Sequence, residues 1–286
     1  MTDTTLSRRA MLRTAGVAAA AAGLAVAAPG VAQAGWGHGW GRRIPKDRIG
    51  IQLYTLRNAF EEDLEGTMEA LADIGYRSVE LAGTYGRSAK EFRRILDRYR
   101  LRAISAHVDF SGADVDQLID DAKTIGYRTA DCAYANFGTI AEWTDFAKRL
   151  DKAGKAFRRA GIKYGYHNHD HEFEAIDGVR PIDVIARHTS RQNIHFEHDL
   201  YWIVTGGADP VREFYRYFGR VTQFHVKDRA EDGGFADLGT GTIDFRRLFR
   251  DTWVGQMKDY IVEHDAPSDP VNTAAVGYRY LANLRF

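Results

Sequence analysis

The 286-residue chain contains a single cysteine and has no excess of charge of either sign. Cys132 has no second thiol with which to form an internal disulfide, and it lies in an apolar run, so we predict a buried core residue and not a nucleophile. Lysine plus arginine and aspartate plus glutamate both number 39, so the chain lacks the positive electrostatic field that attracts nucleic acid or anionic membranes. These absences disfavour a disulfide-stabilised scaffold and a nucleic-acid-binding protein.

Motifs for several common activities are also missing. Residues 53–57 (LYTLR), at the end of the first expected strand, do not form the glycine-rich loop of a nucleotide-binding fold. The chain has neither a phosphate-binding P-loop nor the nucleophile elbow of a serine hydrolase. A nucleotide-dependent or serine-based mechanism therefore has no support.

The N-terminus reads as an export signal. Residues 7–13 (SRRAMLR) contain paired arginines, residues 15–28 form an apolar, alanine-rich run too short to span a bilayer, and residues 32–34 (AQA) resemble a cleavage site. We predict that residues 1–34 direct export by the twin-arginine route. An uncleaved N-terminal anchor helix is the alternative.

The mature protein is then expected in the periplasm or outside the cell, without membrane attachment. Residues 35–45 have no periodicity and are predicted to be a flexible lead-in. Removal of three arginines and one aspartate with the signal leaves 36 basic and 38 acidic residues, a net charge near −2. The sequence allows a homo-oligomer but does not specify one.

Residues 46–286 alternate between short apolar runs and amphipathic stretches. The expected strands are 49–56, 78–81, 103–108, 129–134, 163–169, 194–200, 222–227 and 260–263. The expected helices are 61–74, 88–99, 114–125, 141–160, 181–189, 209–218, 243–252 and 272–282. Eight strand–helix units predict an α/β fold with a parallel sheet, closed as a single-domain (β/α)8 TIM barrel.

Four of these strands turn polar where they end. They contain residues 164–169 (YGYHNH), 196–199 (FEHD), 223–228 (QFHVKD) and 260–264 (YIVEH). The carboxyl ends of barrel strands meet at one mouth, where active sites lie. Taking one nitrogen or oxygen donor per strand predicts a divalent-metal site made of His167, Asp199, His225 and Glu263.

Several longer stretches resemble one family. They are residues 50–57 (GIQLYTLR), 75–82 (GYRSVELA), 167–173 (HNHDHEF), 199–202 (DLYW), 206–210 (GGADP), 225–228 (HVKD) and 239–244 (GTGTID). Together they are similar to the xylose isomerase-like barrels, also called sugar phosphate isomerases/epimerases. The resemblance covers nearly everything after the signal, and it implies an eight-stranded barrel with a divalent ion at its C-terminal mouth. Such barrels include ketose epimerases, inosose dehydratases and apurinic endonucleases.

The chain departs from the epimerase pattern at one position. The resemblance implies Glu, Asp, His and Glu as ligands; Asp199, His225 and Glu263 match the last three, whereas His167 stands in place of the first glutamate. His169 is the alternative ligand if the register slips by two. Two neutral histidines and two carboxylates balance a divalent charge and favour Mn, Zn, Co or Fe over Mg.

The expected activity is metal-dependent isomerisation or epimerisation of a small carbohydrate. Glu263 would remove a proton next to a carbonyl to give an enediolate, and Glu172, Lys227 or His107 would supply the second acid or base. A dehydratase or lyase acting on an oxidised sugar, glycoside or cyclitol is the alternative, and a non-catalytic carbohydrate-binding barrel is the second. The charge balance and the export signal oppose an apurinic endonuclease.

Four further residues are predicted to contact substrate: His107, His169, Trp202 and Tyr54. His107 ends the third strand, and the two aromatic residues could form an apolar platform for a sugar. An exported enzyme meets free sugars more readily than phosphorylated ones, and residues 239–242 (GTGT) provide only a weak phosphate cradle. Asp228 is expected to be structural.

Overall fold

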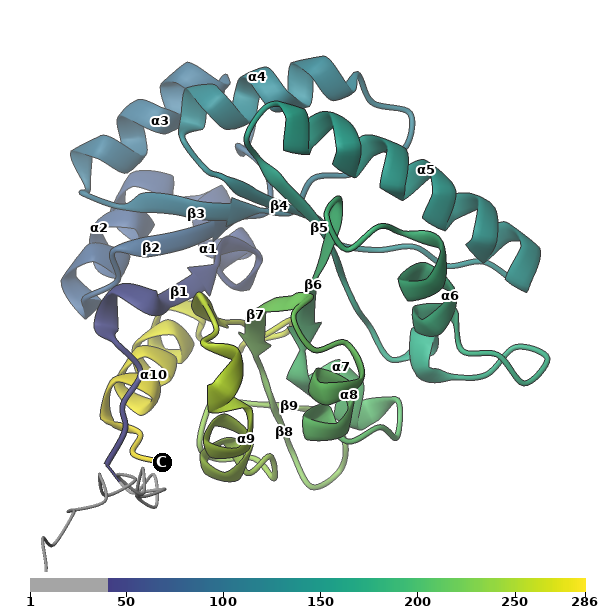
Figure 1. Ribbon diagram of the computed structural model, residues 1–286. Coiled ribbons are helices and arrows are strands. Elements are labelled where there is room, and N and C mark those ends of the chain that lie inside the picture. Colours follow the sequence, from purple (N-terminus) through teal and green to yellow (C-terminus); the bar gives the residue numbers. More distant parts are fainter. Residues whose placement is uncertain (1–40) are drawn as a thin grey trace, which may run out of the picture. The chain divides into compact units, whose positions relative to one another are not determined.

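The computed structural model describes residues 41–286, so the export signal and most of the lead-in, residues 1–40, lie outside the described residues. Within residues 41–286, no helix is both long enough and apolar enough to cross a bilayer. Figure 1 shows helices wound around a central sheet of strands.

The sheet is a parallel barrel. Its strands are β1 (Ile49–Gln52), β2 (Ser78–Leu81), β3 (Arg102–Ala106), β4 (Thr129–Cys132), β5 (Lys163–His167), β6 (Ile194–Asp199), β7 (Val221–Val226) and β10 (Asp259–Val262), in the spatial order β3-β2-β1-β10-β7-β6-β5-β4. A parallel bridge between His107 and Asp131, with the Val108 amide 2.8 Å from the Asp131 carbonyl, joins the two ends of this order. The (β/α)8 prediction is confirmed.

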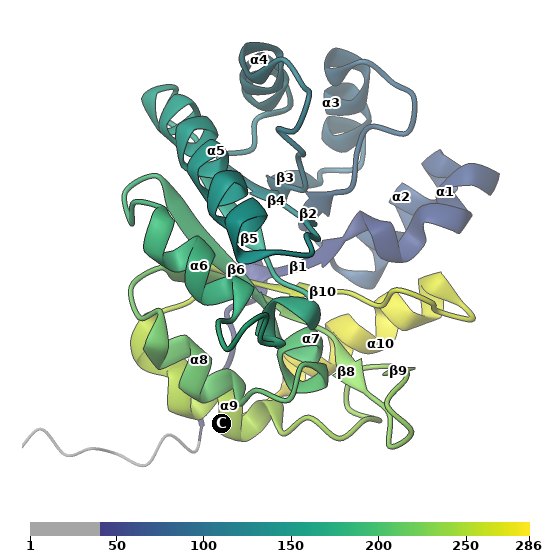
Figure 2. The same ribbon diagram turned by 90° about the vertical axis from the view of Figure 1, so that its right-hand side faces the viewer.

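Helices follow the strands and surround them (Figure 2). They are α1 (Arg57–Glu62), α2 (Leu64–Ile74), α3 (Ala89–Arg98), α4 (Val115–Ile125), α5 (Ile140–Arg159), α6 (Pro181–His188), α7 (Leu200–Thr205), α8 (Pro210–Arg216), α9 (Phe245–Thr252) and α10 (Pro270–Asn283), with 3-10 turns η1 (Lys46–Arg48), η2 (Leu53–Leu56), η3 (His171–Phe173) and η4 (Trp253–Gly255). Gly75 and Gly126 end α2 and α4 with φ of 118° and 101°, a conformation that residues with a Cβ rarely adopt.

Several strand ends differ from prediction. The first strand stops at Gln52, whose side chain accepts a hydrogen bond from the Tyr54 amide at 3.1 Å and starts the turn η2. β5 stops at His167, so His169 lies in the following loop and not on the strand. Residues 200–205 form α7 because the Asp199 carboxylate caps its first turn by accepting from the Trp202 amide. The hairpin of β8 (Asp228–Arg229) and β9 (Phe235–Ala236) was also not predicted.

Apolar side chains pack between the strands and the helices, and Cys132 belongs to this core, as predicted. The inside of the barrel is different. Glu80, Asp131 and Glu197 project from alternate strands β2, β4 and β6, and one oxygen from each lies within 4.8 Å of the others. Barrel interiors are usually filled by branched aliphatic side chains. Fully buried carboxylates at these positions therefore indicate a specialised interior.

Candidate functional site

A cavity of about 380 Å³ opens at the carboxyl ends of the barrel strands. Its lining combines aromatic, imidazole and charged side chains: Tyr54, Ala82, His107, Ala133, Tyr134, His167, His169, Lys227, Glu263 and Asp265. A larger recess of about 720 Å³, whose lining includes five arginines, lies on the outer surface beside α6 and α8. The 380 Å³ cavity is the functional candidate because it contains clustered imidazoles and carboxylates.

The four predicted metal ligands lie together at the inner end of this cavity. His167 ends β5, Asp199 ends β6, His225 lies on β7 and Glu263 follows β10. One nitrogen or oxygen from each is within 4.8 Å of the others, and all four residues are buried. Such convergence of donors from four strands is what a divalent cation requires.

His225 has a carboxylate at each ring nitrogen. Its Nε2 lies 2.5 Å from Glu80 Oε2, and its Nδ1 lies 2.8 Å from Glu263 Oε2. Burial alone would lower the pKa of His225, but nearby carboxylates outweigh it and raise the pKa well above its usual value. The ring therefore carries two protons, unless a metal ion takes the place of the proton on Nδ1.

His167 is already prepared as a neutral ligand. Its Nδ1 lies 3.2 Å from Glu197 Oε2, whereas its Nε2 lies 3.7 Å from Asp199 Oδ2, too far for a hydrogen bond. Burial, assisted by the neighbouring His225, lowers the pKa of His167 to about 3. A neutral ring that donates from Nδ1 leaves the Nε2 lone pair free for a metal.

The charge balance also fits a divalent ion. Lys227 Nζ lies 3.0 Å from Asp199 Oδ2, 2.9 Å from Glu263 Oε2 and 2.8 Å from Asp265 Oδ1. One ammonium facing three carboxylates leaves two negative charges, and the doubly protonated His225 ring beside Glu263 offsets one of them only until a metal replaces the proton on Nδ1. Asp199 Oδ2 is buried and has no hydrogen-bond partner of acceptable geometry among residues 41–286. The residues present therefore fit a divalent cation.

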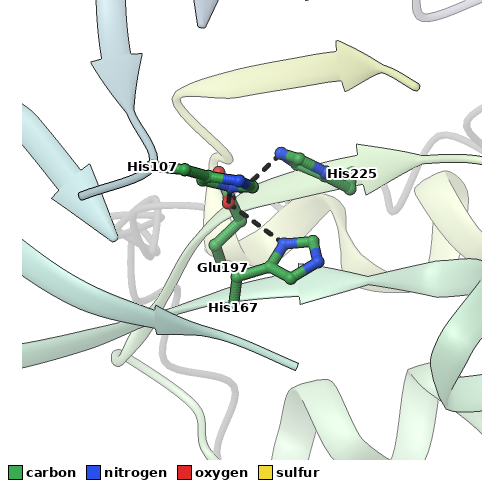
Figure 3. A group of neighbouring side chains, drawn as sticks. All are labelled: His107, His167, Glu197 and His225. Atoms are coloured by element: carbon green, nitrogen blue, oxygen red, sulfur yellow. Dashed lines mark hydrogen bonds and ion pairs between the residues drawn. The ribbon is translucent and has the colours of Figure 1, made fainter. Parts of the chain in front are cut away.

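Sequence reasoning did not include Glu80, Glu197 or Asp265 in the site. Strand alternation places Glu197 on the same face of β6 as Asp199, but taking one donor per strand selected Asp199, which lies later in the strand. Glu80 is far from the polar strand ends in sequence and reaches His225 only because the barrel closes. Figure 3 shows Glu197 surrounded by His107, His167 and His225.

Glu172 lies outside the cavity lining and is fully buried. Tyr166 donates a hydrogen bond to its Oε1 at 2.6 Å, and the His169 amide donates to its Oε2 at 2.8 Å. Burial raises the pKa of Glu172 to about 7. The side chain thus fixes the loop that carries His169, and a direct role in catalysis stays a prediction.

Three of the four predicted substrate contacts line the cavity: His107, His169 and Tyr54. Trp202 is not among the cavity-lining residues; its ring packs against His169, with the two ring centroids 5.3 Å apart. Sequence reasoning missed Tyr134, which lines the cavity and is 57% exposed.

Asp228 is structural, and it occupies the weak phosphate cradle. Its Oδ2 accepts hydrogen bonds from the Gly239 and Gly241 amides at 3.0 and 3.1 Å, and its Oδ1 accepts from the Ile243 amide at 3.2 Å. These amides are therefore already engaged, which removes them as phosphate donors.

The closed parallel barrel, with its polar site at the strand carboxyl ends, has the architecture of the α/β-barrel enzymes. More specifically, the chain belongs to the xylose isomerase-like TIM-barrel family, whose model matches residues 68–251.

The chain is also similar to curated relatives and to solved structures with this fold. The chain is 26% identical over 261 residues to an inosose dehydratase of Clostridium tetani, covering 76% of this chain and 87% of the relative. It is 22% identical over 268 residues to an inosose dehydratase of Lacticaseibacillus casei, covering 77% and 89%. A sugar phosphate isomerase/epimerase from Parabacteroides distasonis superposes with a TM-score of 0.73 at 23% identity, covering 82% of this chain and 98% of that one. A probable 3-DHS dehydratase from Bacillus anthracis superposes with a TM-score of 0.63 at 14% identity, covering 82% and 99%.

Proposed function

We propose that the chain is a metal-dependent dehydratase that removes water from an uncharged keto sugar or keto cyclitol. The observation that carries this proposal is the convergence of His167, Asp199, His225 and Glu263 at the inner end of the cavity. The relatives named inosose dehydratase favour dehydration over the isomerisation that the sequence first suggested. Both reactions begin with removal of a proton next to a carbonyl.

The four converging side chains would hold the metal. When bound, a divalent cation supplies Lewis-acid stabilisation for negative charge that develops on a carbonyl oxygen. Glu263 lines the cavity and is the proton acceptor. Its burial opposes ionisation, but Lys227 and His225 outweigh this and hold the pKa of Glu263 well below its usual value, so the carboxylate is ionised at neutral pH.

Dehydration also needs an acid for the departing hydroxyl group, and His107 is suited to this role. Its Nε2 lies 2.9 Å from Glu197 Oε2 and 3.4 Å from Glu80 Oε2, and its ring borders the cavity. Burial opposes protonation of His107, but Glu80 and Glu197 outweigh it and raise the pKa to about 9. The ring is therefore an imidazolium at neutral pH and has a proton to give.

The cavity favours a substrate without phosphate or carboxylate groups. The cations among the described cavity-lining residues are Lys227, which three carboxylates surround, and the His107 imidazolium, which contacts Glu197 and Glu80. Glu263 and Asp265 line the same wall and would repel an anion. Tyr54 and Tyr134, which are 43% and 57% exposed, offer rings on which a neutral sugar can stack.

The test is incubation of the metal-loaded protein in heavy water with inososes, free keto sugars and 3-keto-glycosides. We expect loss of water to give an unsaturated or diketo product, detected by NMR and mass spectrometry. Deuterium incorporation without loss of water would instead establish an isomerase or epimerase. Absence of both reactions, with sugar binding retained, would establish the binding-barrel alternative.

We further propose that the protein acts after export through the twin-arginine route, in the periplasm or outside the cell. The paired arginines at residues 8–9, the apolar run and the small-residue cleavage site support this proposal. Replacing both residues with lysine, R8K and R9K, should retain the full-length precursor in the cytoplasm, as immunoblotting of cell fractions would show. Unchanged export of the double variant would contradict the assignment.

A further inference from the structure

Two carboxylates lie directly beneath the proposed metal ligands. Glu80 comes from β2 and Glu197 from β6, and both are fully buried inside the barrel. Neither lines the cavity, so neither can touch a substrate held there. Any contribution they make to the site must therefore pass through the side chains of the proposed ligands.

Glu197 contacts three imidazoles through a single oxygen (Figure 3). Its Oε2 lies 2.9 Å from His107 Nε2, 3.2 Å from His167 Nδ1 and 3.2 Å from His225 Nε2. Two of these rings are proposed ligands, and they reach Glu197 from the neighbouring strands β5 and β7.

Glu80 makes the closer contact with His225. Its Oε2 lies 2.5 Å from His225 Nε2 and also accepts a hydrogen bond from the Gln52 side-chain amide at 2.9 Å. Gln52 thereby holds the carboxylate toward the ring. Both glutamates thus face the imidazole nitrogens on the side opposite Asp199 and Glu263.

This arrangement fixes which nitrogen each ring presents to a metal. His167 donates from Nδ1 to Glu197, which leaves Nε2 facing Asp199. His225 donates from Nε2 to Glu80, which leaves Nδ1 facing Glu263. A carboxylate that accepts the second ring proton of a metal-ligating histidine orients the ring and increases its basicity.

We propose that Glu80 and Glu197 are positioning residues that set the tautomer and orientation of His225 and His167. The inference rests on the proposed function, since it assumes that these histidines hold a metal. It assigns neither glutamate as a metal ligand or a catalytic group.

One rival arrangement uses the same atoms. His107, His167, Glu197 and His225 also offer donors within 4.8 Å of one another, and Glu197 Oε1 has no hydrogen-bond partner among residues 41–286. A metal bound there would make Glu197 a ligand. The set of His167, Asp199, His225 and Glu263 is favoured because it offers two carboxylates to balance a divalent charge, whereas the rival set offers only one.

The test is a calorimetric titration of the purified metal-free protein with Mn²⁺, compared among E197Q, E80Q and D199N. Glutamine keeps the shape of glutamate but cannot carry its charge, so we expect one ion per chain with an affinity about 10–100-fold weaker in E197Q and E80Q. D199N should lose binding more severely, because it removes a ligand. Co²⁺ absorption spectra should keep the parent's band positions in E197Q and E80Q, because the ligand set is unchanged.

The matched control is E213Q, since Glu213 is also a buried glutamate but pairs with Arg180 on the outer side of the barrel. It should bind Mn²⁺ with the affinity of the parent. Thermal unfolding and circular dichroism of each variant confirm that the fold is intact.

Parent-like affinity in both E197Q and E80Q would overturn the positioning role while leaving the metal site in place. Complete loss in E197Q with retention in D199N would also overturn it, because Glu197 would then be a ligand. A parent protein that binds none of Mn²⁺, Co²⁺, Zn²⁺ and Fe²⁺ would overturn both this inference and the proposed function.

Discussion

At the scale of single residues, Lys227 links Asp199, at the end of β6, to Glu263 and Asp265, which follow β10. Its side chain is 1% exposed, and its ammonium contacts Asp199, Glu263 and Asp265. These carboxylates outweigh the effect of burial and raise the pKa of Lys227 above its usual value, so the residue stays charged. The site is thus held together by a buried cation that belongs to the chain itself.

Replacing Lys227 by methionine should be strongly destabilising. K227M leaves three carboxylates without their shared partner, and breaking a buried ion pair costs about 3–5 kcal/mol. Mn²⁺ should recover more of the lost stability in K227M than it adds to the parent, because more negative charge is then uncompensated. Urea unfolding with and without Mn²⁺ measures both effects, and a free energy of unfolding equal to that of the parent would contradict the account.

The titration of the buried Glu172 carboxyl should be visible in the pH dependence of the free energy of unfolding. Burial raises its pKa from the usual 4.5 to about 7, so the folded state binds more protons than the unfolded state between these values. Stability contributed by this group is therefore present below pH 4.5 and is lost as pH rises through 7. The total change is about 3 kcal/mol, from 1.36 kcal/mol per pKa unit.

The variant E172Q has no proton to lose there, and its stability should fall less over that range. Urea unfolding of parent and variant from pH 4.5 to 8 gives the difference directly. Parallel profiles would show that Glu172 does not titrate as described.

At the scale of elements, the packing of β5 inside the barrel requires a glycine at position 165. A Cβ on Gly165 would lie 2.1 Å from Asp131 Oδ1 and 2.6 Å from His195 Nε2, two atoms that are themselves 2.9 Å apart. The glycine therefore makes room for a buried Asp–His pair in the barrel interior.

We expect G165A to destabilise the protein by about 1–3 kcal/mol, the usual cost of overpacking a well-filled interior. The matched control is G138A, where a Cβ would meet nothing within 4 Å and where φ is not positive. Its stability should stay close to that of the parent. Equal free energies of unfolding for the two variants, measured in urea, would contradict the role assigned to Gly165.

The elements were largely predictable from sequence because apolar alternation and helix caps are local signals. Strand ends were not, because side chains such as Gln52 and Asp199 bond to nearby amides and start new turns there. α7 was missed because its six residues, Leu200–Thr205, are too few to show a helical period.

At the scale of the whole molecule, the barrel brings together donors that the sequence separates by almost 100 positions, from His167 to Glu263. The sequence predicted this convergence because the parallel strands end at one mouth. It did not predict the buried carboxylates under the ligands, since Glu80 meets His225 only across the closed barrel. The roles of the site residues stay predictions, as does the metal itself.

The most direct test of the central claim is a crystal structure of the protein soaked with Mn²⁺, with anomalous scattering recorded to locate the ion. The account predicts one strong peak within about 2.0–2.4 Å of one atom each of His167, Asp199, His225 and Glu263, a range typical of first-row metals with such donors. A peak bounded by His107 and Glu197, or no peak between the four side chains, would contradict it.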